Sequence, residues 1–169
     1  MTQIEVKDFQ FRDDGVIPNH PFLPTLLYKG ALQGKEDQAE QIFNRNNWLN
    51  SWTNGVFDYH HYHSNSHEVL GVIRGSALLQ IGGAAGREIE VRNGDVILLP
   101  AGTGHKKMSS SSDFSVVGAY PNGMDYNLRT GKQGERPLVL EEIANVPFPQ
   151  KDPLFGEEGP LMVYWKMNN

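Results

Sequence analysis

The sequence predicts an all-β protein, built as a sandwich or barrel of short strands. From residue 51 to about 120 the chain follows a period of two, which is the alternation of a β-strand. Gly and Pro turn signals interrupt this region at roughly 8–12-residue intervals, the spacing typical of sandwiches and barrels. The whole chain contains 18 glycines and 10 prolines, which fits many turns between short strands.

The N-terminal third is expected to be less regular. Residues 1–30 carry several prolines, and within them the short apolar run at 26–28 could form a strand. A helix is predicted over residues 36–47, because apolar residues recur at i, i+3 and i+4 from Ala39.

The strands themselves are predicted where period-two segments are bounded by Gly, Pro, Asn or Ser turns. These segments are residues 56–63, 69–73, 77–81, 88–91, 96–99 and 114–120. The remaining elements are expected to be a serine loop at 109–112, a polar loop at 121–137, a short helix or strand at 137–144 and a last strand at 161–165. No repeat or linker is visible, so one domain over residues 1–169 is expected.

The composition excludes several classes of protein. Of 169 residues, 38% are hydrophobic and 21% are charged, an ordinary globular balance. A net charge of −5 argues against a nucleic-acid surface, which needs a basic face. No apolar run approaches the roughly 20 residues of a membrane span, and no signal-peptide pattern is visible, so a cytoplasmic location is expected. The absence of cysteine excludes disulfides and thiolate ligands.

The histidines carry the strongest functional signal. His61 and His63 are separated by one residue, so on a strand both would lie on one face, about 7 Å apart. Glu68 follows a short turn and can return on the neighbouring strand, and His105 could complete the set after a second turn. Imidazole is the commonest protein ligand for several transition metals. Three imidazoles and a carboxylate would leave an octahedral ion two positions for water, O₂ or substrate, whereas zinc more often has four ligands in total.

The other histidines are expected to have no part in this set. Strand alternation points His60 and His67 away from the face of His61 and His63. His20 stands apart in the sequence and is expected to be a loop residue.

Three further residues are candidates for a substrate pocket. Phe57 and Tyr59 share the inward face with the histidines, although simple core packing is the alternative for Phe57. A buried Tyr59 hydroxyl would need a partner. Lys107 has the same parity as His105 and could attract an anionic substrate, or it could be a solvated lysine near a strand end.

Two stretches of the chain resemble the motifs of the cupin family. The first motif is matched by Gly55-(x5)-His61-x-His63-(x4)-Glu68-(x6)-Gly75, and the second by Gly94-(x5)-Pro100-x-Gly102-(x2)-His105. The second motif customarily ends on Asn after three more residues, and Ser109 stands there instead. In the family that Asn is not a metal ligand, so the departure concerns a turn. The motifs span residues 55–75 and 94–109, and the flanking segments are similar to the YjlB-like group of single-domain bacterial cupins.

The resemblance implies a cupin double-stranded β-helix (a jelly-roll barrel), here with a short N-terminal helix and irregular N- and C-terminal extensions. It also implies one divalent metal ion, which could be Fe, Mn, Ni or Zn. Carried over position by position, the metal ligands would be His61, His63, Glu68 and His105.

The expected function is an enzyme that acts on a small organic molecule. Dioxygenase-type chemistry is favoured because such cupin sites frequently perform it, with Glu68 able to leave the metal and act as a general base. A sugar isomerase or epimerase is the closest competitor. A non-catalytic cupin that binds or senses a small ligand is the second hypothesis. A homodimer is expected, since pairing covers an exposed sheet edge.

Overall fold

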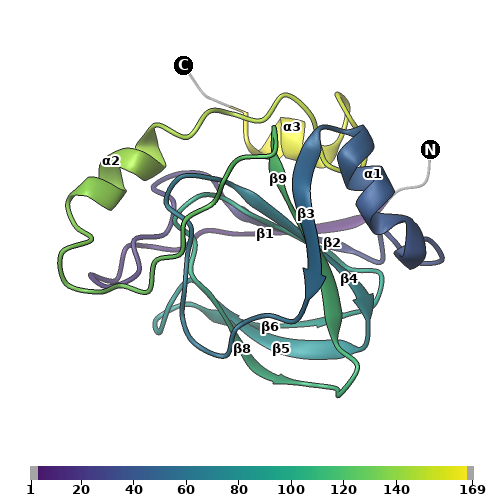
Figure 1. The fold of residues 1–169 in the computed structure, drawn as a ribbon, viewed down its shortest axis with the longest axis horizontal. Helices are drawn as coiled ribbons and strands as arrows, with labels where there is room; N and C mark the ends of the chain where they lie inside the picture. Colours follow the sequence, from purple (N-terminus) through teal and green to yellow (C-terminus); the bar gives the residue numbers. More distant parts are fainter. Residues whose placement is uncertain (1–3, 167–169) are drawn as a thin grey trace.

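Two antiparallel sheets form the body of the molecule (Figure 1). The structure, a computed structural model, describes residues 4–166. The larger sheet has six strands in the order β1-β2-β7-β4-β9-β3, and the smaller has three in the order β6-β5-β8. The strands are β1 (Glu5–Phe9), β2 (Thr25–Lys29), β3 (Trp48–Asn54), β4 (Glu68–Arg74), β5 (Ser76–Ile81), β6 (Arg87–Arg92), β7 (Val96–Leu99), β8 (His105–Ser110) and β9 (Ser115–Pro121). The helices are the 3₁₀ helix η1 (Glu36–Gln38), α1 (Ala39–Arg45), α2 (Leu138–Ala144) and α3 (Pro160–Tyr164).

The central strands of the larger sheet are buried on both faces, which explains why they are nearly continuous apolar runs. Along β7, Ile97 and Leu99 pack into the space between the sheets, while Val96 and Leu98 pack on the opposite face. That opposite face is covered by α1 and α3, which Figure 1 shows on the side away from β5, β6 and β8. A strand covered on both faces has no polar side to alternate with, so its sequence reads as an apolar run.

The all-β prediction is confirmed, and the two antiparallel sheets agree with the double-sheet architecture that the family resemblance implies. The predicted segments at 69–73, 77–81, 88–91 and 96–99 fall within β4, β5, β6 and β7, and the segment at 114–120 begins one residue before β9. The helix predicted over 36–47 is present as η1 followed by α1, and the short run at 26–28 is the centre of β2. The uncertain segment at 137–144 is helical, as α2.

Four local predictions are wrong. Residues 161–165 lie in α3 and just beyond it, where Pro160 at the first helical position favours a helix over a strand. Ser109 and Ser110 belong to β8 and pair with β5, so the serine loop begins later than expected. Residues 5–9, within the segment expected to be irregular, form the edge strand β1.

The fourth wrong prediction, a strand over 56–63, bears on the site. β3 ends at Asn54, and the following segment leaves the larger sheet and runs beside β8 of the smaller sheet. There the amide of Lys107 donates to the carbonyl of Phe57 at 2.8 Å, and His61 forms an isolated bridge with His105. The segment therefore crosses from the larger sheet to the smaller one. A strand that stayed paired with one neighbour along its whole length could not do this.

No helix within residues 4–166 is long and apolar enough to cross a membrane.

Candidate metal centre

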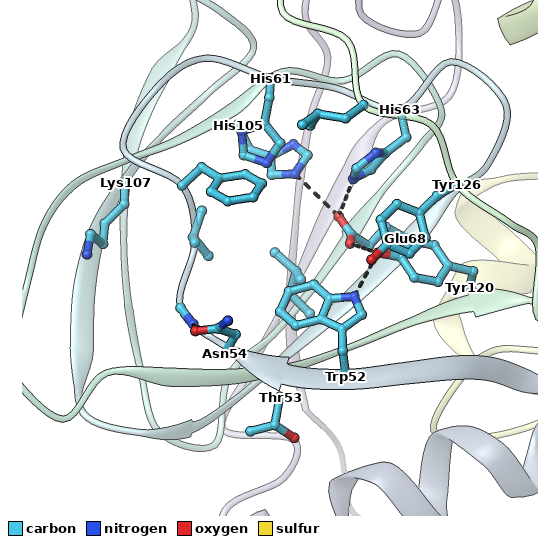
Figure 2. Close-up of a pocket in the computed structure, with 15 residues that line it drawn as sticks. Trp52, Thr53, Asn54, His61, His63, Glu68, His105, Lys107, Tyr120 and Tyr126 are labelled. Carbon is cyan, nitrogen blue, oxygen red and sulfur yellow. Dashed lines mark hydrogen bonds and ion pairs between the residues drawn. The ribbon is translucent and has the colours of Figure 1, made fainter.

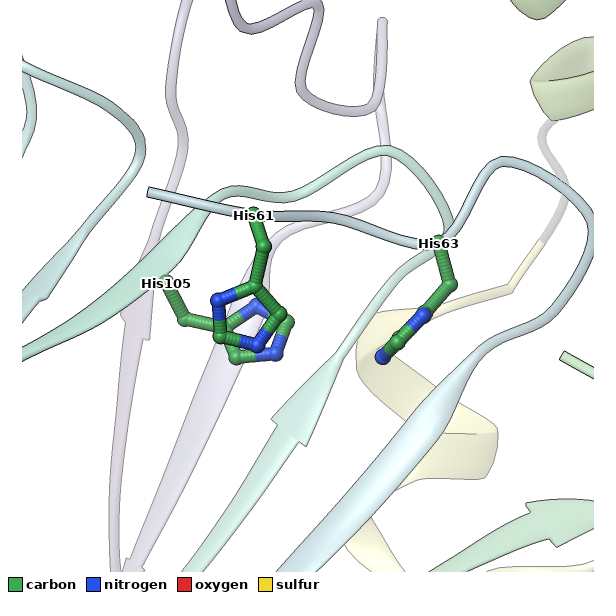
Figure 3. A group of neighbouring side chains, drawn as sticks. All are labelled: His61, His63 and His105. Carbon is green, nitrogen blue, oxygen red and sulfur yellow. The ribbon is translucent and has the colours of Figure 1, made fainter. Parts of the chain in front are cut away.

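Three buried imidazoles meet at one end of the space between the sheets (Figure 3). One ring nitrogen from each of His61, His63 and His105 lies within 4.8 Å of the others. The backbones of His61 and His105 exchange two hydrogen bonds, at 3.2 and 2.9 Å, which sets their rings side by side. His63 projects to the same place two residues further along. The structure thus brings together the three histidines that the sequence singles out.

Each of the three rings is oriented by a backbone carbonyl. The Nδ1 atoms of His61 and His105 donate to the carbonyls of Tyr59 and Thr103, both at 3.0 Å, and Nδ1 of His63 donates to the carbonyl of Asn127. A carbonyl only accepts hydrogen bonds, so Nδ1 carries the proton in each ring. The Nε2 atom of a neutral ring then has its lone pair free. Metal-binding histidines in proteins are oriented in this way.

Glu68, the first residue of β4, completes the cluster (Figure 2). Its Oε1 atom lies 3.4 Å from Nε2 of His63 and 3.3 Å from Nε2 of His105. Oε1 is buried and has no hydrogen-bond donor among the residues described. Atoms that bear only lone pairs repel at this distance unless a proton or a cation lies between them. The donor set therefore fits a bound metal ion.

The other carboxylate oxygen of Glu68 is held by a chain of two aromatic residues. Tyr120 donates its hydroxyl to Oε2 at 2.6 Å, and the indole of Trp52 donates to the Tyr120 hydroxyl at 2.8 Å. This chain fixes one oxygen of the carboxylate and leaves Oε1 directed at the imidazoles. Figure 2 shows the chain below and beside the histidines.

Charge and burial act in opposite directions on the groups of this centre. Burial alone would raise the pKa of Glu68, but His63 and His105 outweigh it and hold the pKa far below its usual range. Burial would lower the pKa of His63, and the Glu68 carboxylate raises it instead. Burial, reinforced by the neighbouring His105, lowers the pKa of His61 to about 3. Burial and the Glu68 charge raise the pKa of Tyr120, so its hydroxyl stays protonated and can donate.

A cavity of about 510 Å³ opens onto the histidines, a volume in the range of small-molecule sites. Most of its wall is apolar. Phe57 and Lys107, two of the three expected pocket residues, line it. Beyond the histidines and Glu68, the remaining lining residues are Trp52, Thr53, Asn54, Gly55, Val56, Leu70, Tyr120, Tyr126 and Leu128.

Tyr59, the third expected pocket residue, does not line the cavity. Its ring stacks on Phe57 with centroids 4.9 Å apart, and 41% of the residue is exposed. The expectation assumed strand alternation through 56–63, which the segment does not have. Tyr59 contributes through its carbonyl, which orients His61.

The remaining histidines lie outside the centre, and one of them, His67, does not lie where alternation placed it. His60 is half-buried and does not line the cavity. The outward orientation expected for His67 is wrong: only 1% of it is exposed, and its ring lies 4.9 Å from Trp165 and 6.3 Å from His20. The face away from the cavity is itself buried, because α3 and the C-terminal segment cover it. His20 is a buried loop residue.

Sequence reasoning missed the residues that support the centre from a distance. Asn127 and Tyr126 lie in the loop after β9, more than sixty positions from His63. Trp52 and Tyr120 come from β3 and β9, which pair with each other in the larger sheet. A buried tyrosine must find a hydrogen-bond partner, which was the one available signal for Tyr120. Its partner depends on strand register, which one sequence does not reveal.

Comparison with known proteins identifies the class. A family model of the cupin domain matches residues 52–115, and the chain belongs to the cupin family. Within it, the chain is similar to the uncharacterized protein YjlB of Bacillus subtilis (strain 168), with 47% identity over 161 residues. That alignment covers 95% of this chain and 97% of the Bacillus protein.

Solved structures resemble the chain more weakly. Procruciferin, an 11S globulin from Brassica napus, is 18% identical with a TM-score of 0.40, over 74% of this chain and 29% of that one. Acireductone dioxygenase from Bacillus anthracis, solved with a cadmium ion in its active center, is 18% identical with a TM-score of 0.36, over 59% of this chain and 62% of that one. The chain spans less than two thirds of either protein, and neither likeness bears on function.

Proposed function

We propose that this cupin is an enzyme that holds one divalent metal ion and acts on a small organic molecule in the adjoining cavity. His61, His63 and His105 would bind the ion through Nε2, with Glu68 as a fourth ligand. Two observations carry this proposal. One ring nitrogen from each of the three histidines lies within 4.8 Å of the others, and the unpartnered Oε1 atom of Glu68 lies 3.4 Å from Nε2 of His63 and 3.3 Å from Nε2 of His105.

The ligand types narrow the choice of ion. Three imidazoles and one carboxylate suit Fe(II), Mn(II), Ni(II) or Zn(II), and the chain has no cysteine to offer a softer site. When bound, such an ion supplies Lewis-acid chemistry and, if it is redox-active, access to O₂ chemistry.

The protein's own residues would prepare the substrate and the proton acceptor. Glu68 is ionised at neutral pH, and Tyr120 fixes one of its oxygens, so Oε1 would accept a proton as a general base only when Glu68 leaves the ion. Apolar side chains such as Val56, Leu70 and Leu128 would exclude water from the substrate and strengthen the electrostatic effects inside.

Dioxygenase-type oxidation of a small organic acid or diol-like compound is the favoured reaction. An apolar cavity next to a nitrogen-rich ligand set supports it. Oxygen uptake by Fe(II)-loaded protein against a panel of catechols, diketones and small thiols tests it. Turnover of a sugar without oxygen uptake would favour the isomerase, and no turnover with any of the four metals would favour a non-catalytic binder.

Metal binding is tested first. Protein purified without a histidine tag should carry about one first-row ion per chain by mass spectrometry. The double variant His61→Ala, His63→Ala should carry none, while His60→Ala, which alters a histidine outside the cavity, should keep the wild-type content. Wild-type protein that refuses added Fe, Mn, Ni and Zn would overturn the proposal.

Three organisational features stay predictions. A single domain over 1–169 and a cytoplasmic location rest on the sequence. A homodimer is supported by β1, an edge strand of the larger sheet whose outer side pairs with no described strand. Light scattering that gives a monomer mass would refute the dimer.

A further inference from the structure

Lys107 is the one cationic side chain, histidines aside, in the described wall of the cavity. It lies on β8 two residues after His105, so both side chains project from the same face of the strand. The other charged residue there, Glu68, already faces Tyr120 and the imidazoles. A protein of net charge −5 thus presents a positive charge in its cavity. Such a charge raises the local concentration of anions.

The ammonium group of Lys107 has no ion pair or hydrogen bond within residues 4–166. Lys29 and Arg136, by contrast, are paired: Lys29 lies 3.2 Å from Asp95, and Arg136 lies 2.6 Å from Asp13. The backbone of Lys107, in contrast, is fixed, because its amide donates to the carbonyl of Phe57 at 2.8 Å. A cation with a fixed base and an unpaired head is suited to bind a ligand charge.

The rest of the cavity suits a flat apolar body. Phe57 lies edge-on to His61 with centroids 5.1 Å apart, and Tyr126 lies edge-on to His63 at the same distance, so an aromatic ring flanks the centre on either side. Trp52 adds a third ring to the wall. Figure 2 places Lys107 across the cavity from Tyr126. A molecule spanning this distance would have its charge at one end and apolar surface along its length.

We propose that the cavity binds an apolar monocarboxylate, such as an arylalkanoate, with its carboxylate on Lys107 and its ring between the aromatic walls. A single lysine matches one negative charge. Phosphate sites more often use arginine forks or helix N-termini. The inference deepens the proposed function by naming a substrate class for the same cavity. It is carried by Lys107 and the walls, so it does not depend on the metal.

Calorimetry with two probes of the same skeleton tests this inference. Metal-stripped protein is titrated with 3-phenylpropionate and with neutral 3-phenylpropanol. The carboxylate should bind about tenfold tighter, since hydrogen bonds to charged groups are the stronger kind. Lys107→Gln should remove this preference and leave the alcohol within about twofold.

The matched control is Lys106→Gln, which removes the same charge from the neighbouring position of β8. Lys106 does not line the cavity, so this variant should bind both probes as the wild type does. Equal affinity for the two probes, an equal loss in both variants, or binding of neither probe would overturn the inference.

The same samples separate this inference from the proposed function. Their metal content and metal affinity are measured alongside the titrations. Lys107-dependent binding of the carboxylate in a protein that takes up no metal would overturn the metal centre and leave the inference standing. A protein that binds metal but shows no preference for the carboxylate would overturn the inference and leave the metal centre standing.

Discussion

The molecule contains two groups of buried histidines that differ in the direction of one hydrogen bond. In the cluster of His61, His63 and His105, each Nδ1 donates to a backbone carbonyl. In the pair of His20 and His67, each Nδ1 accepts from a backbone amide, that of Leu23 at 3.0 Å and that of Ala101 at 2.9 Å.

This difference decides which histidines are available as ligands. A neutral imidazole has one protonated nitrogen and one lone pair. In the cluster the lone pair is on Nε2 and faces the cavity, whereas in the pair it is on Nδ1 and is already used by the backbone. Burial does not separate the groups, because it lowers the pKa of His61 and of His67 alike to about 3. Orientation by the backbone is therefore a better criterion for a ligand than burial or clustering.

The largest expected effect is on metal affinity, when one histidine is removed from each group in turn. His63→Ala should weaken metal binding by more than about 100-fold, the upper limit for residues that only support a ligand. His67→Leu should leave metal affinity within about threefold, although residue 67 adjoins Glu68. Competition with a chromophoric chelator measures both. Similar losses in the two variants would mean that the hydrogen-bond direction does not distinguish the groups.

The second effect is on stability. His67→Leu leaves the buried amide of Ala101 without an acceptor, so the metal-free protein should lose about 1–3 kcal/mol of unfolding free energy. Urea denaturation followed by circular dichroism measures this loss. His60→Leu is the control, because His60 is only half-buried and outside the core, and it should change stability by less than about 0.5 kcal/mol. An undiminished stability in His67→Leu would contradict a structural role for the pair.

The third effect is on metal affinity when the hydrogen bond that orients Glu68 is removed. Tyr120→Phe removes the donor to Oε2 of Glu68 and should weaken metal binding about tenfold, which is typical of a residue that orients a ligand. Tyr126→Phe is the matched control, since the structure gives the Tyr126 hydroxyl no hydrogen bond while its ring stacks on Tyr120. Equal affinities in both variants would mean that Glu68 needs no such support.

The smallest expected effect is the pH dependence of stability that the pair of His20 and His67 confers. Burial lowers the pKa of His20 from its ordinary 6.5 to about 4. The unfolded chain thus binds more protons between these values, so the stability that His20 contributes is complete above pH 6.5 and is lost as the pH falls toward 4. Its titratable neighbour is His67, and Arg12 and Asp13 line the same surface hollow.

The variant His20→Asn isolates this contribution. Asparagine can accept from the amide of Leu23 but does not titrate in this range. Between pH 7 and pH 5.5 the wild type should lose about 1 kcal/mol more stability than the variant. Urea titrations at both values measure the difference, and parallel losses would show that His20 is not the sensitive group.

The sequence predicted the centre better than the path of the chain around it. Five of the six strands expected between residues 56 and 120, and the spacing of His61, His63, Glu68 and His105, follow from local patterns, namely period-two segments, turns and two motifs. Such patterns survive in one sequence because they depend on neighbouring residues.

The wrong predictions that bear on the site involve contacts between distant segments. Alternation was extended through 56–63, where the chain changes from one sheet to the other, so Tyr59 was misplaced. His67 was expected to face solvent because nothing local indicates that Trp165 covers it. Tyr120 and Trp52 were missed because their roles depend on the pairing of β9 with β3.

The backbones of His61 and His105 are joined by two hydrogen bonds, and the exchange of these amide protons would report how often the centre opens. Their amide protons can exchange with solvent only when the segment after β3 detaches from β8, and that event also separates two of the imidazoles. Hydrogen exchange at these two amides would therefore measure how often the centre comes apart, and slower exchange on adding an ion would give the coupling between metal binding and local opening.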